Sequence, residues 1–343
     1  MTPCLELDAA ELDNVGLDLS LFDYRLPEEL IAQAPLADRA GSRMLVLYRN
    51  EQRWEDRMFR EFPSFLQAGD CLVLNDSKVF PSRLLGKRGT TDVEVFLLRP
   101  VTPAGETWEA LVRPGKKLAL GEQIVFGGVR AEIVGRRPFG ERTVRFALDR
   151  DIYRWLNEVG HVPLPPYIKR ADGQEDRQRY QTVFAQRTGS VAAPTAGLHF
   201  TQEILTQCRE QSRADIAYIT LHVGLGTFQP VRGESLHVER FSISEESEAK
   251  IRAASRVVCA GTTSVRSVES LFLGRKGETD LFIRPGFAFQ RVDAMLTNFH
   301  LPQSSLLMLV CAFAGREFVL EAYSHAVAER YRFFSYGDCM LVV

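Results

Sequence analysis

The chain has 343 residues, of which 45% are hydrophobic and 25% charged, and its formal net charge is −2. This length indicates two domains or one large domain with an insertion. The composition is typical of a globular protein with a buried core, which excludes a mainly disordered chain. The net charge argues against a surface covered in positive potential, although a local basic patch is enough to bind nucleic acid.

Three further features concern membranes, secretion and metal binding. The longest apolar run, residues 306–314, is far shorter than the ~20 residues that cross a bilayer. Residues 1–20 form an acidic extension without the basic and apolar regions of a secretory signal. The six cysteines are never closer than 28 positions, which excludes local redox and zinc-ribbon motifs. We therefore expect a reduced, cytoplasmic protein without a metal site.

The first half of the chain changes character near residue 79. Residues 26–31 combine a proline with two acids, which predicts the start of a helix. Residues 44–48 and 71–74 are short apolar runs that predict buried strands. From there to residue 149, β-type runs alternate with glycine- and proline-rich turns, which predicts a small barrel or sandwich. The runs are residues 93–97, 108–112, 123–126, 131–134 and 143–146.

Helical periodicity returns at residues 151–159, and helices then alternate with strands. The expected order is a helix at 202–211, a strand at 215–223, a helix at 245–254, a strand at 256–261 and a helix at 264–273. Such alternation indicates an α/β layer. We expect an α/β domain formed by residues 21–78 and 150–343, with an all-β barrel of the six-stranded type inserted at 79–149.

The sequence lacks the phosphate loop and the GxSxG, HExxH and GxGxxG motifs. Instead, five loops of small, polar and histidine residues follow predicted strands, where ligands bind in α/β sheets. They span residues 192–200, 222–230, 261–270, 297–302 and 334–338. Each has a plainer interpretation: a buried histidine is more often a core residue, Arg266 and Glu269 could form a helix-surface ion pair, and residues 336–338 could be only a turn. The histidines do not follow local metal-ligand spacing.

The loops contain the sequences AAPTAGLHF (192–200), HVGLGTF (222–228), GTTSVR (261–266) and TNFHLP (297–302). Together with segments 22–27, 74–84, 163–168 and 331–338, they resemble the signature segments of the S-adenosylmethionine:tRNA ribosyltransferase-isomerase family of queuosine biosynthesis. The resemblance covers essentially everything after residue 20. The acidic extension lies outside it, and the chain is several residues short after Val231, which leaves the roles of His237 and Glu239 open.

The resemblance implies a reaction and an architecture. The ribosyl part of S-adenosylmethionine would be transferred and isomerised onto 7-aminomethyl-7-deazaguanine at the tRNA wobble position, which gives epoxyqueuosine and releases adenine and methionine. S-adenosylmethionine is then a co-substrate, with no separate cofactor, no membrane and no obligate protein partner. The architecture implied is again an α/β domain with an inserted β-barrel.

This chemistry requires proton transfer, so we predict His199 and His300 as the leading acid–base groups because neutral imidazole titrates near pH 7. Asp338 would orient or deprotonate the amine, and Glu269 is the reserve base. The predicted substrate-binding residues are Thr195, Gly197, His222, Gly224, Gly226, Thr227, Phe228, Thr262, Thr263, Arg266, Asn298 and Tyr336. The predicted RNA contacts, which are otherwise ordinary surface charge, are Lys78, Arg83, Arg113, Lys116 and Lys117.

Two other functions stay open at this point. One is a different S-adenosylmethionine-dependent RNA-modifying enzyme, such as a methyltransferase that uses the loop at Gly224. It would release S-adenosylhomocysteine instead of free adenine. The other is a non-catalytic RNA-binding protein with an OB-type barrel, which would bind RNA without any turnover.

Overall fold

The computed structural model describes residues 18–102, 105–115, 118–137, 140–224 and 236–343. Most of the acidic extension therefore lies outside the described residues. The same holds for five predicted site residues, Lys116, Lys117, Gly226, Thr227 and Phe228.

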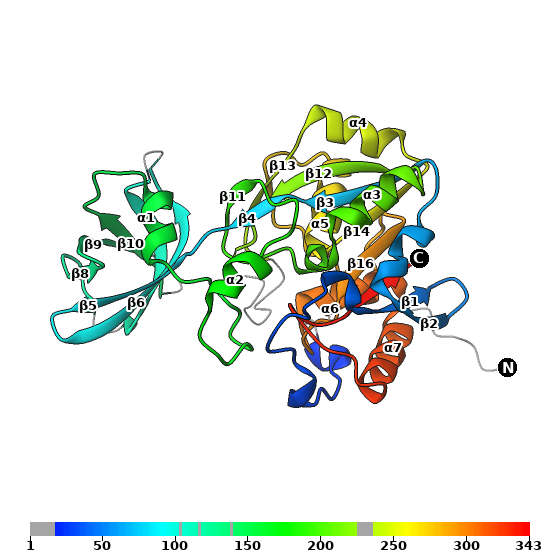
Figure 1. The fold of residues 1–343 in the computed structure, drawn as a ribbon, viewed down its shortest axis with the longest axis horizontal. Coiled ribbons are helices and arrows are strands. Elements are labelled where there is room, and N and C mark those ends of the chain that lie inside the picture. The colour runs from blue at the N-terminus through cyan, green and yellow to red at the C-terminus, as the bar shows by residue number, and fades with distance from the viewer. Residues whose placement is uncertain (1–17, 103–104, 116–117, 138–139, 225–235) are drawn as a thin grey trace.

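A nine-stranded mixed sheet forms the centre of the larger part of the molecule (Figure 1). Its order is β15-β13-β12-β3-β14-β16-β17-β1-β2. The strands are β1 (Arg43–Tyr48), β2 (Arg53–Met58), β3 (Asp70–Asn75), β12 (Asp215–Leu221), β13 (Glu239–Ile243), β14 (Arg256–Ala260), β15 (Glu278–Thr279), β16 (Ala294–Asn298) and β17 (Cys339–Val342). The four neighbours β12, β3, β14 and β16 run parallel, so their carboxyl ends lie at one edge of the sheet.

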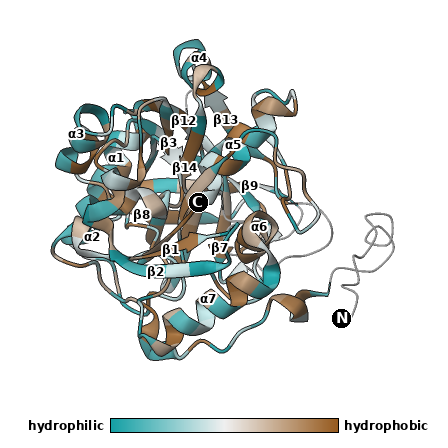
Figure 2. Cartoon of the chain, turned by 90° about the vertical axis from the view of Figure 1, so that its right-hand side faces the viewer, coloured by the Kyte–Doolittle hydropathy of each residue, from teal (hydrophilic) through white to brown (hydrophobic). Residues whose placement is uncertain are grey.

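Helices cover both faces of this sheet, as expected for an α/β domain. One face packs against α4 (Glu245–Ala253), α5 (Thr262–Phe272), α6 (Ser305–Ala314) and α7 (Arg316–Ala328), and the other against α3 (Gln202–Glu210) and the 3₁₀ helix Phe59–Phe65. In β3, Cys71 and Val73 belong to the first core, while Leu72 and Leu74 belong to the second. Burial on both faces explains the continuous apolar run of this strand, and Figure 2 shows that the outer helix α3 is largely hydrophilic.

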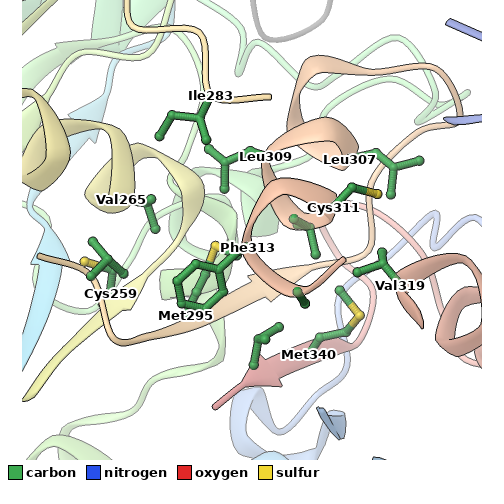
Figure 3. Close-up of a cluster of buried hydrophobic side chains, with 14 of the residues drawn as sticks. Cys259, Val265, Ile283, Met295, Leu307, Leu309, Cys311, Phe313, Val319 and Met340 are labelled. Carbon is green, nitrogen blue, oxygen red and sulfur yellow. The ribbon is translucent and has the colours of Figure 1, made fainter. Parts of the chain in front are cut away.

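The first of these cores lies between the sheet and helices α5, α6 and α7 (Figure 3). Met295 on β16 and Phe313 on α6 lie together there, close to Cys259 on β14. The Ser304 side chain caps α6 by accepting a hydrogen bond from the backbone N–H of Leu307. Because α6 is covered by α7 as well as by the sheet, nearly all of its residues are apolar.

The second part of the molecule is a closed six-stranded barrel, which confirms the expected insert. Its strands pair in the order β10-β7-β6-β5-β8-β9. They are β5 (Arg83–Arg88), β6 (Thr91–Pro100), β7 (Thr107–Arg113), β8 (Gln123–Phe126), β9 (Val129–Arg136) and β10 (Arg142–Phe146). The five predicted runs fall within β6 to β10. The sequence did not indicate β5 because Gly86 and three basic residues interrupt its apolar pattern.

Helix α1 (Ile152–Val159) packs against the barrel and not against the large sheet. Its side chains Ile152, Trp155 and Leu156 are buried in the barrel core. We therefore propose that the inserted unit extends through α1, beyond the expected boundary at residue 149. A two-stranded parallel sheet of β4 (Ser77–Val79) and β11 (Arg187–Ser190) lies between the barrel and the large sheet (Figure 1).

The helix expected at residues 26–31 is wrong. Only a 3₁₀ turn, Glu28–Leu30, forms there. The backbone N–H of Ala32 donates to the Phe333 carbonyl, and the N–H of Phe333 donates to the Leu30 carbonyl. These long-range backbone bonds hold the chain extended after Leu30 and outweigh its local helical preference. The other helices outside the barrel are α2 (Gln174–Arg179) and the 3₁₀ helices Leu19–Phe22, Arg39–Gly41 and Thr195–His199.

Over the ranges that the structure describes, none of the helices has the length and apolar character needed to cross a membrane. The same ranges contain no group of three or more histidine, cysteine, aspartate or glutamate residues placed to hold a metal ion. Five cysteines, Cys71, Cys208, Cys259, Cys311 and Cys339, are buried free thiols.

Candidate active site at the carboxyl ends of the parallel strands

A pocket lies at the carboxyl ends of β12, β14 and β16. Every one of the five predicted loops (192–200, 222–230, 261–270, 297–302 and 334–338) contributes at least one residue to its lining. The lining is formed mainly by small, hydroxyl-bearing and aromatic side chains. Segments that are far apart in the sequence thus meet at the edge where α/β sheets bind ligands.

Asn75, at the end of β3, fastens the neighbouring strand ends together. Its side-chain amide donates to the Leu221 carbonyl (3.0 Å) and to Thr263 Oγ1 (3.3 Å), and its amide oxygen accepts from the Leu221 N–H (3.1 Å). Asn75 is 1% exposed. It was not among the predicted site residues, although an asparagine that ends an otherwise apolar strand is a recognisable signal.

The N-terminus of α5 faces the pocket. Gly261 precedes it with a φ of +91°, a conformation that favours glycine, and its N–H donates to the Leu296 carbonyl (2.7 Å). No side chain caps the helix, so its first N–H groups are available to a ligand, as at other anion-binding helix starts. Thr262 and Thr263 line the pocket beside these N–H groups, and their role as a cradle of donors stays a prediction.

His300 is the histidine that lines the pocket, and it is held firmly. Its Nε2 lies 2.7 Å from Thr297 Oγ1, and its backbone N–H and carbonyl bond to the hydroxyls of Tyr323 and Tyr24. Burial lowers the pKa of His300 to about 3, because a low-dielectric surrounding disfavours the charged form. The imidazole is therefore neutral at pH 7.

His199 lies behind the pocket and contacts it through Asn298. Its Nε2 is 3.3 Å from Asn298 Oδ1, and its Nδ1 is 2.9 Å from Ser42 Oγ. Because the amide oxygen only accepts, Nε2 carries the proton and Nδ1 accepts from the Ser42 hydroxyl. Burial, with smaller contributions from Arg39 and Arg332, lowers the pKa of His199 to about 4. The premise that these imidazoles titrate near pH 7 is therefore wrong for both histidines.

Tyr167 and Ser335 form a polar contact in the lining that sequence reasoning did not assign. The Tyr167 hydroxyl lies 2.6 Å from Ser335 Oγ, and the Tyr167 ring lies 4.7 Å from the ring of Phe334. Burial raises the pKa of Tyr167 to about 12, so the phenol keeps its proton at neutral pH. The signal for this pair was present, since Tyr167 and Ser335 belong to segments that carried the resemblance.

A family model described as "Queuosine biosynthesis protein" matches residues 19–342. The chain belongs to this queuosine biosynthesis family. It is 57% identical, over 95% of its length and 100% of the relative, to the S-adenosylmethionine:tRNA ribosyltransferase-isomerase of Solibacter usitatus (strain Ellin6076). It is also similar to the crystal structure of an S-adenosylmethionine tRNA ribosyltransferase from Thermotoga maritima, with 39% identity, 94% of this chain and 100% of that chain covered, and a TM-score of 0.55. These matches confirm the resemblance and the fold class.

Within this member of the queuosine biosynthesis family, two predicted bases do not reach the pocket. Asp338 accepts hydrogen bonds from the backbone N–H groups of Arg43 (2.9 Å) and Arg332 (2.8 Å). Glu269 accepts from three consecutive N–H groups, those of residues 290–292. Both carboxylates are buried and hold backbone, which corrects their expected role as bases. No carboxylate belongs to the part of the pocket lining that the structure describes.

Arg266 is also placed differently from the expectation. It forms a buried ion pair with Glu239 and donates from Nε to the Leu281 carbonyl (3.0 Å), and it is not part of the pocket lining. The second oxygen of Glu239 accepts from the Gly224 N–H (2.9 Å). The Arg266–Glu239 pair therefore holds the backbone at Gly224, just after β12. The role of Glu239, which the sequence left open, is thus to bind Arg266 and this backbone.

Four more predicted residues lie outside the pocket lining, and one of them is Gly224, whose N–H donates to Glu239. His222 lines a separate basin with Asp76, and its ring packs so closely on Gly189 that a Cβ there would lie 2.8 Å from it. Gly197 packs on Thr182, from which a Cβ would be 2.7 Å away. Tyr336 lines a neighbouring cleft, and its hydroxyl donates to Asp176 (2.8 Å). The pocket thus brings together Thr195, Thr262, Thr263, Asn298 and His300 from the predicted set.

The predicted RNA contacts in the described residues divide into two groups. Lys78 on β4 and Arg113 at the end of β7 are exposed. Arg83 instead donates from Nε to Glu94 (2.6 Å), so a neighbouring carboxylate already compensates its charge.

Proposed function

We propose that the protein is a transferase-isomerase that moves the ribosyl part of S-adenosylmethionine onto 7-aminomethyl-7-deazaguanine at the wobble position of tRNA. Adenine and methionine would leave, and no further cofactor takes part. Membership of the queuosine biosynthesis family and the name of the Solibacter usitatus relative support this reaction. The structural observation that supports it best is the convergence of all five loops on one pocket.

The reaction makes three demands on the pocket. The sulfonium group acidifies the adjacent C5′ hydrogens, so a base must remove a proton there. The departing adenine needs a proton or hydrogen-bond donors, and the attacking amine must be neutral. Since a positioned acid or base contributes only about 10²- to 10⁴-fold, holding both substrates in one preorganised site supplies most of the acceleration.

We assign substrate binding to the α5 N-terminus and to the loop before α3. Uncapped N–H groups with the hydroxyls of Thr262 and Thr263 suit the methionine carboxylate or the ribose hydroxyls. The small residues 192–196 let the backbone approach the adenosine closely. The Tyr167–Ser335 contact adds two further hydroxyl groups to the wall.

We assign proton transfer to His300, the imidazole in the described lining. A pKa of about 3 makes the resting imidazole neutral and a weak base, and it also means that a proton taken from C5′ would readily pass on to the departing adenine. His199 is a positioning residue in this proposal, because it acts on the pocket through Asn298.

The test combines purified protein, S-adenosylmethionine and an anticodon stem-loop that carries the aminomethyl-deazaguanine. We expect free adenine, free methionine and a ribosyl mass gain on the RNA, and none of these with a stem-loop carrying guanine. Release of S-adenosylhomocysteine with a methyl mass gain would identify a methyltransferase. Tight RNA binding without turnover would identify a binding protein.

The same assay tests the proton-transfer assignment. His300→Ala should lower the single-turnover rate about 10²- to 10⁴-fold. His325→Ala is the matched control, since His325 lies on α7 next to Asp56 and outside the pocket lining, and it should react at the normal rate. A normal rate for His300→Ala would remove His300 from the chemistry.

A further inference from the structure

A second cleft adjoins the pocket, and two arginines line it. Arg39 and Arg179 line it together with His199, and Ser335 lines both the cleft and the pocket. Arg332 donates a hydrogen bond to the Ala34 carbonyl, next to residues 35 and 36 of the cleft wall. The His199–Asn298 contact therefore separates a cluster of three guanidinium groups from the proposed reaction site.

These three arginines differ from most others among the described residues because none of them forms an ion pair with a carboxylate. Burial lowers the pKa of Arg332, although the charge of Asp338 raises it in part. Within the described residues they donate only to backbone carbonyls: Arg39 to residues 198 and 178, Arg179 to residues 36 and 37, and Arg332 to residue 34. Arg170, Arg256 and Arg266, by contrast, each form an ion pair. A carbonyl dipole does not cancel a full charge, so the cluster keeps its positive potential.

Two donors in the cluster have no partner among the described residues. Arg179 Nε and Arg332 Nη1 are buried without a hydrogen bond, which is costly for a charged group. The acids near the cluster do not satisfy them. Asp38 lines the cleft, but its side chain is exposed and pairs with Arg60, while the oxygens of Asp338 accept backbone N–H groups. Unsatisfied, partly buried cations beside a cleft indicate an anionic ligand.

The electrostatic effect of the cluster is visible on its neighbours. Burial lowers the pKa of Arg39, and the charge of Arg179 lowers it further. After burial, the charges of Arg39 and Arg332 are among the causes that lower the pKa of His199. The positive potential therefore extends from the cleft to the side chain that contacts Asn298 of the pocket.

We propose that this arginine cleft, lined by Arg39 and Arg179 with Arg332 beside it, binds a phosphate group of the RNA that flanks the modified nucleotide. The inference rests on the proposed function and deepens it by placing the RNA backbone. When a base leaves its stack to enter a pocket, its flanking phosphates come to the rim of that pocket. A phosphodiester offers two anionic oxygens that match the guanidinium fork.

The other anion in the reaction is the carboxylate of S-adenosylmethionine, and it fits this cleft less well. The sulfonium and ammonium groups outweigh that carboxylate, so the co-substrate carries a net positive charge. Three arginines without an ion-pair partner would repel it. The α5 N-terminus offers the carboxylate a site inside the pocket, which leaves the arginine cleft to the RNA.

The test changes one charge on each side of the interface. Stem-loops carry a neutral methylphosphonate at the 5′ or the 3′ phosphate of the modified nucleotide, or in the stem as a control. The protein is wild type, Arg332→Gln or Arg179→Gln, with the exposed Arg154→Gln on α1 as the matched control. We expect Arg332→Gln and Arg179→Gln to lower kcat/KM for the RNA about 10- to 100-fold without changing KM for S-adenosylmethionine.

With the wild-type protein, one of the two flanking methylphosphonates should lower kcat/KM by the same factor. An arginine substitution combined with that methylphosphonate should cause no larger loss than either alone, because each removes the same contact. Losses that multiply, or a wild-type enzyme indifferent to both flanking linkages, would overturn the proposal. A variant that raises KM for S-adenosylmethionine instead would place the carboxylate in the cleft, which also overturns it. The methylphosphonate changes only the RNA. Its effect on the wild-type protein can therefore be read even if an arginine variant fails to fold. Absence of any turnover by the wild-type protein would count against the proposed function. In that case the affinities for the same stem-loops would test the phosphate contact separately from the reaction.

Discussion

Burial decides the protonation state of the two histidines at the site. His199 and His300 both have hydrogen-bond partners, yet the pKa of each lies well below 6.5 because the protein replaces water around the ring. In the unfolded chain the same side chains titrate near 6.5. Below that pH the unfolded state binds protons that the folded state does not, so stability is lost as pH falls.

This linkage predicts a specific loss of stability in acid. With folded pKa values of about 4 and about 3, each histidine should cost roughly 2 kcal/mol of unfolding free energy between pH 7 and pH 5. His199→Asn and His300→Asn should each reduce this acid-side loss by about that amount. Denaturant unfolding at the two pH values measures it. Ser264→Ala is the control, since it removes a buried hydroxyl that bonds the Ala260 carbonyl but does not titrate. An unchanged pH dependence in both histidine variants would contradict the prediction.

Which polar residues serve the pocket could be predicted only in part. The hydroxyls of Thr262 and Thr263 were recognisable because hydroxyl clusters at a helix start have a local meaning. Aspartate, glutamate and arginine are common catalytic residue types. Here, however, Asp338 and Glu269 bind distant backbone N–H groups, and Arg266 binds Glu239 on β13. A single sequence does not reveal whether a carboxylate is already satisfied, so these three were misplaced.

At the scale of elements, helix α5 connects the fold to the site. Glycines with positive φ flank it, Gly261 at +91° before the helix and Gly274 at +77° after it. A Cβ at Gly261 would lie 3.6 Å from Thr263 Oγ1, which is ordinary van der Waals contact, and a Cβ at Gly274 would meet nothing within 4 Å. Alanine at either position would therefore act mainly through backbone strain.

We predict that Gly261→Ala and Gly274→Ala each lower the unfolding free energy by about 1–2 kcal/mol. Only Gly261→Ala should also lower kcat/KM, because it shifts the first turn of α5 at the pocket, whereas Gly274 lies at the opposite end. Denaturant unfolding and the adenine-release assay measure the two effects. Equal activities for two equally destabilised variants would show that the start of α5 does not position the substrate.

Elements with strong local patterns were predictable, and those held by distant contacts were not. The β3 run of 71–74 is apolar because both of its faces are buried, and the runs of β6, β8 and β9 alternate as barrel strands do. The turn at Glu28–Leu30 depends on backbone bonds to Phe333, more than 300 residues away. The assignment of α1 to the barrel depends on which core buries Trp155, which its own periodicity does not specify.

For the whole molecule, charge is divided unevenly between the two parts. The insert 79–149 contains twelve lysines and arginines against eight aspartates and glutamates, a net charge of +4. Since the chain as a whole carries −2, the remainder carries −6. A polyanion is therefore repelled by most of the molecule and attracted by local groups, which makes the barrel side the expected place for contacts outside the pocket.

Salt dependence tests this distribution. Stem-loop affinity should fall with salt, and on a single strand each phosphate contact contributes a slope of about −0.7 in log affinity against log salt. Lys78→Ala and Arg113→Ala, at exposed positions on β4 and β7, should each weaken binding and flatten that slope by about one contact. Lys276→Ala, an exposed lysine that is not among the predicted RNA contacts, is the control and should keep both affinity and slope. If Lys276→Ala changed the salt slope as much as Lys78→Ala and Arg113→Ala do, the net charge of the protein, and not the barrel side, would govern the encounter with RNA.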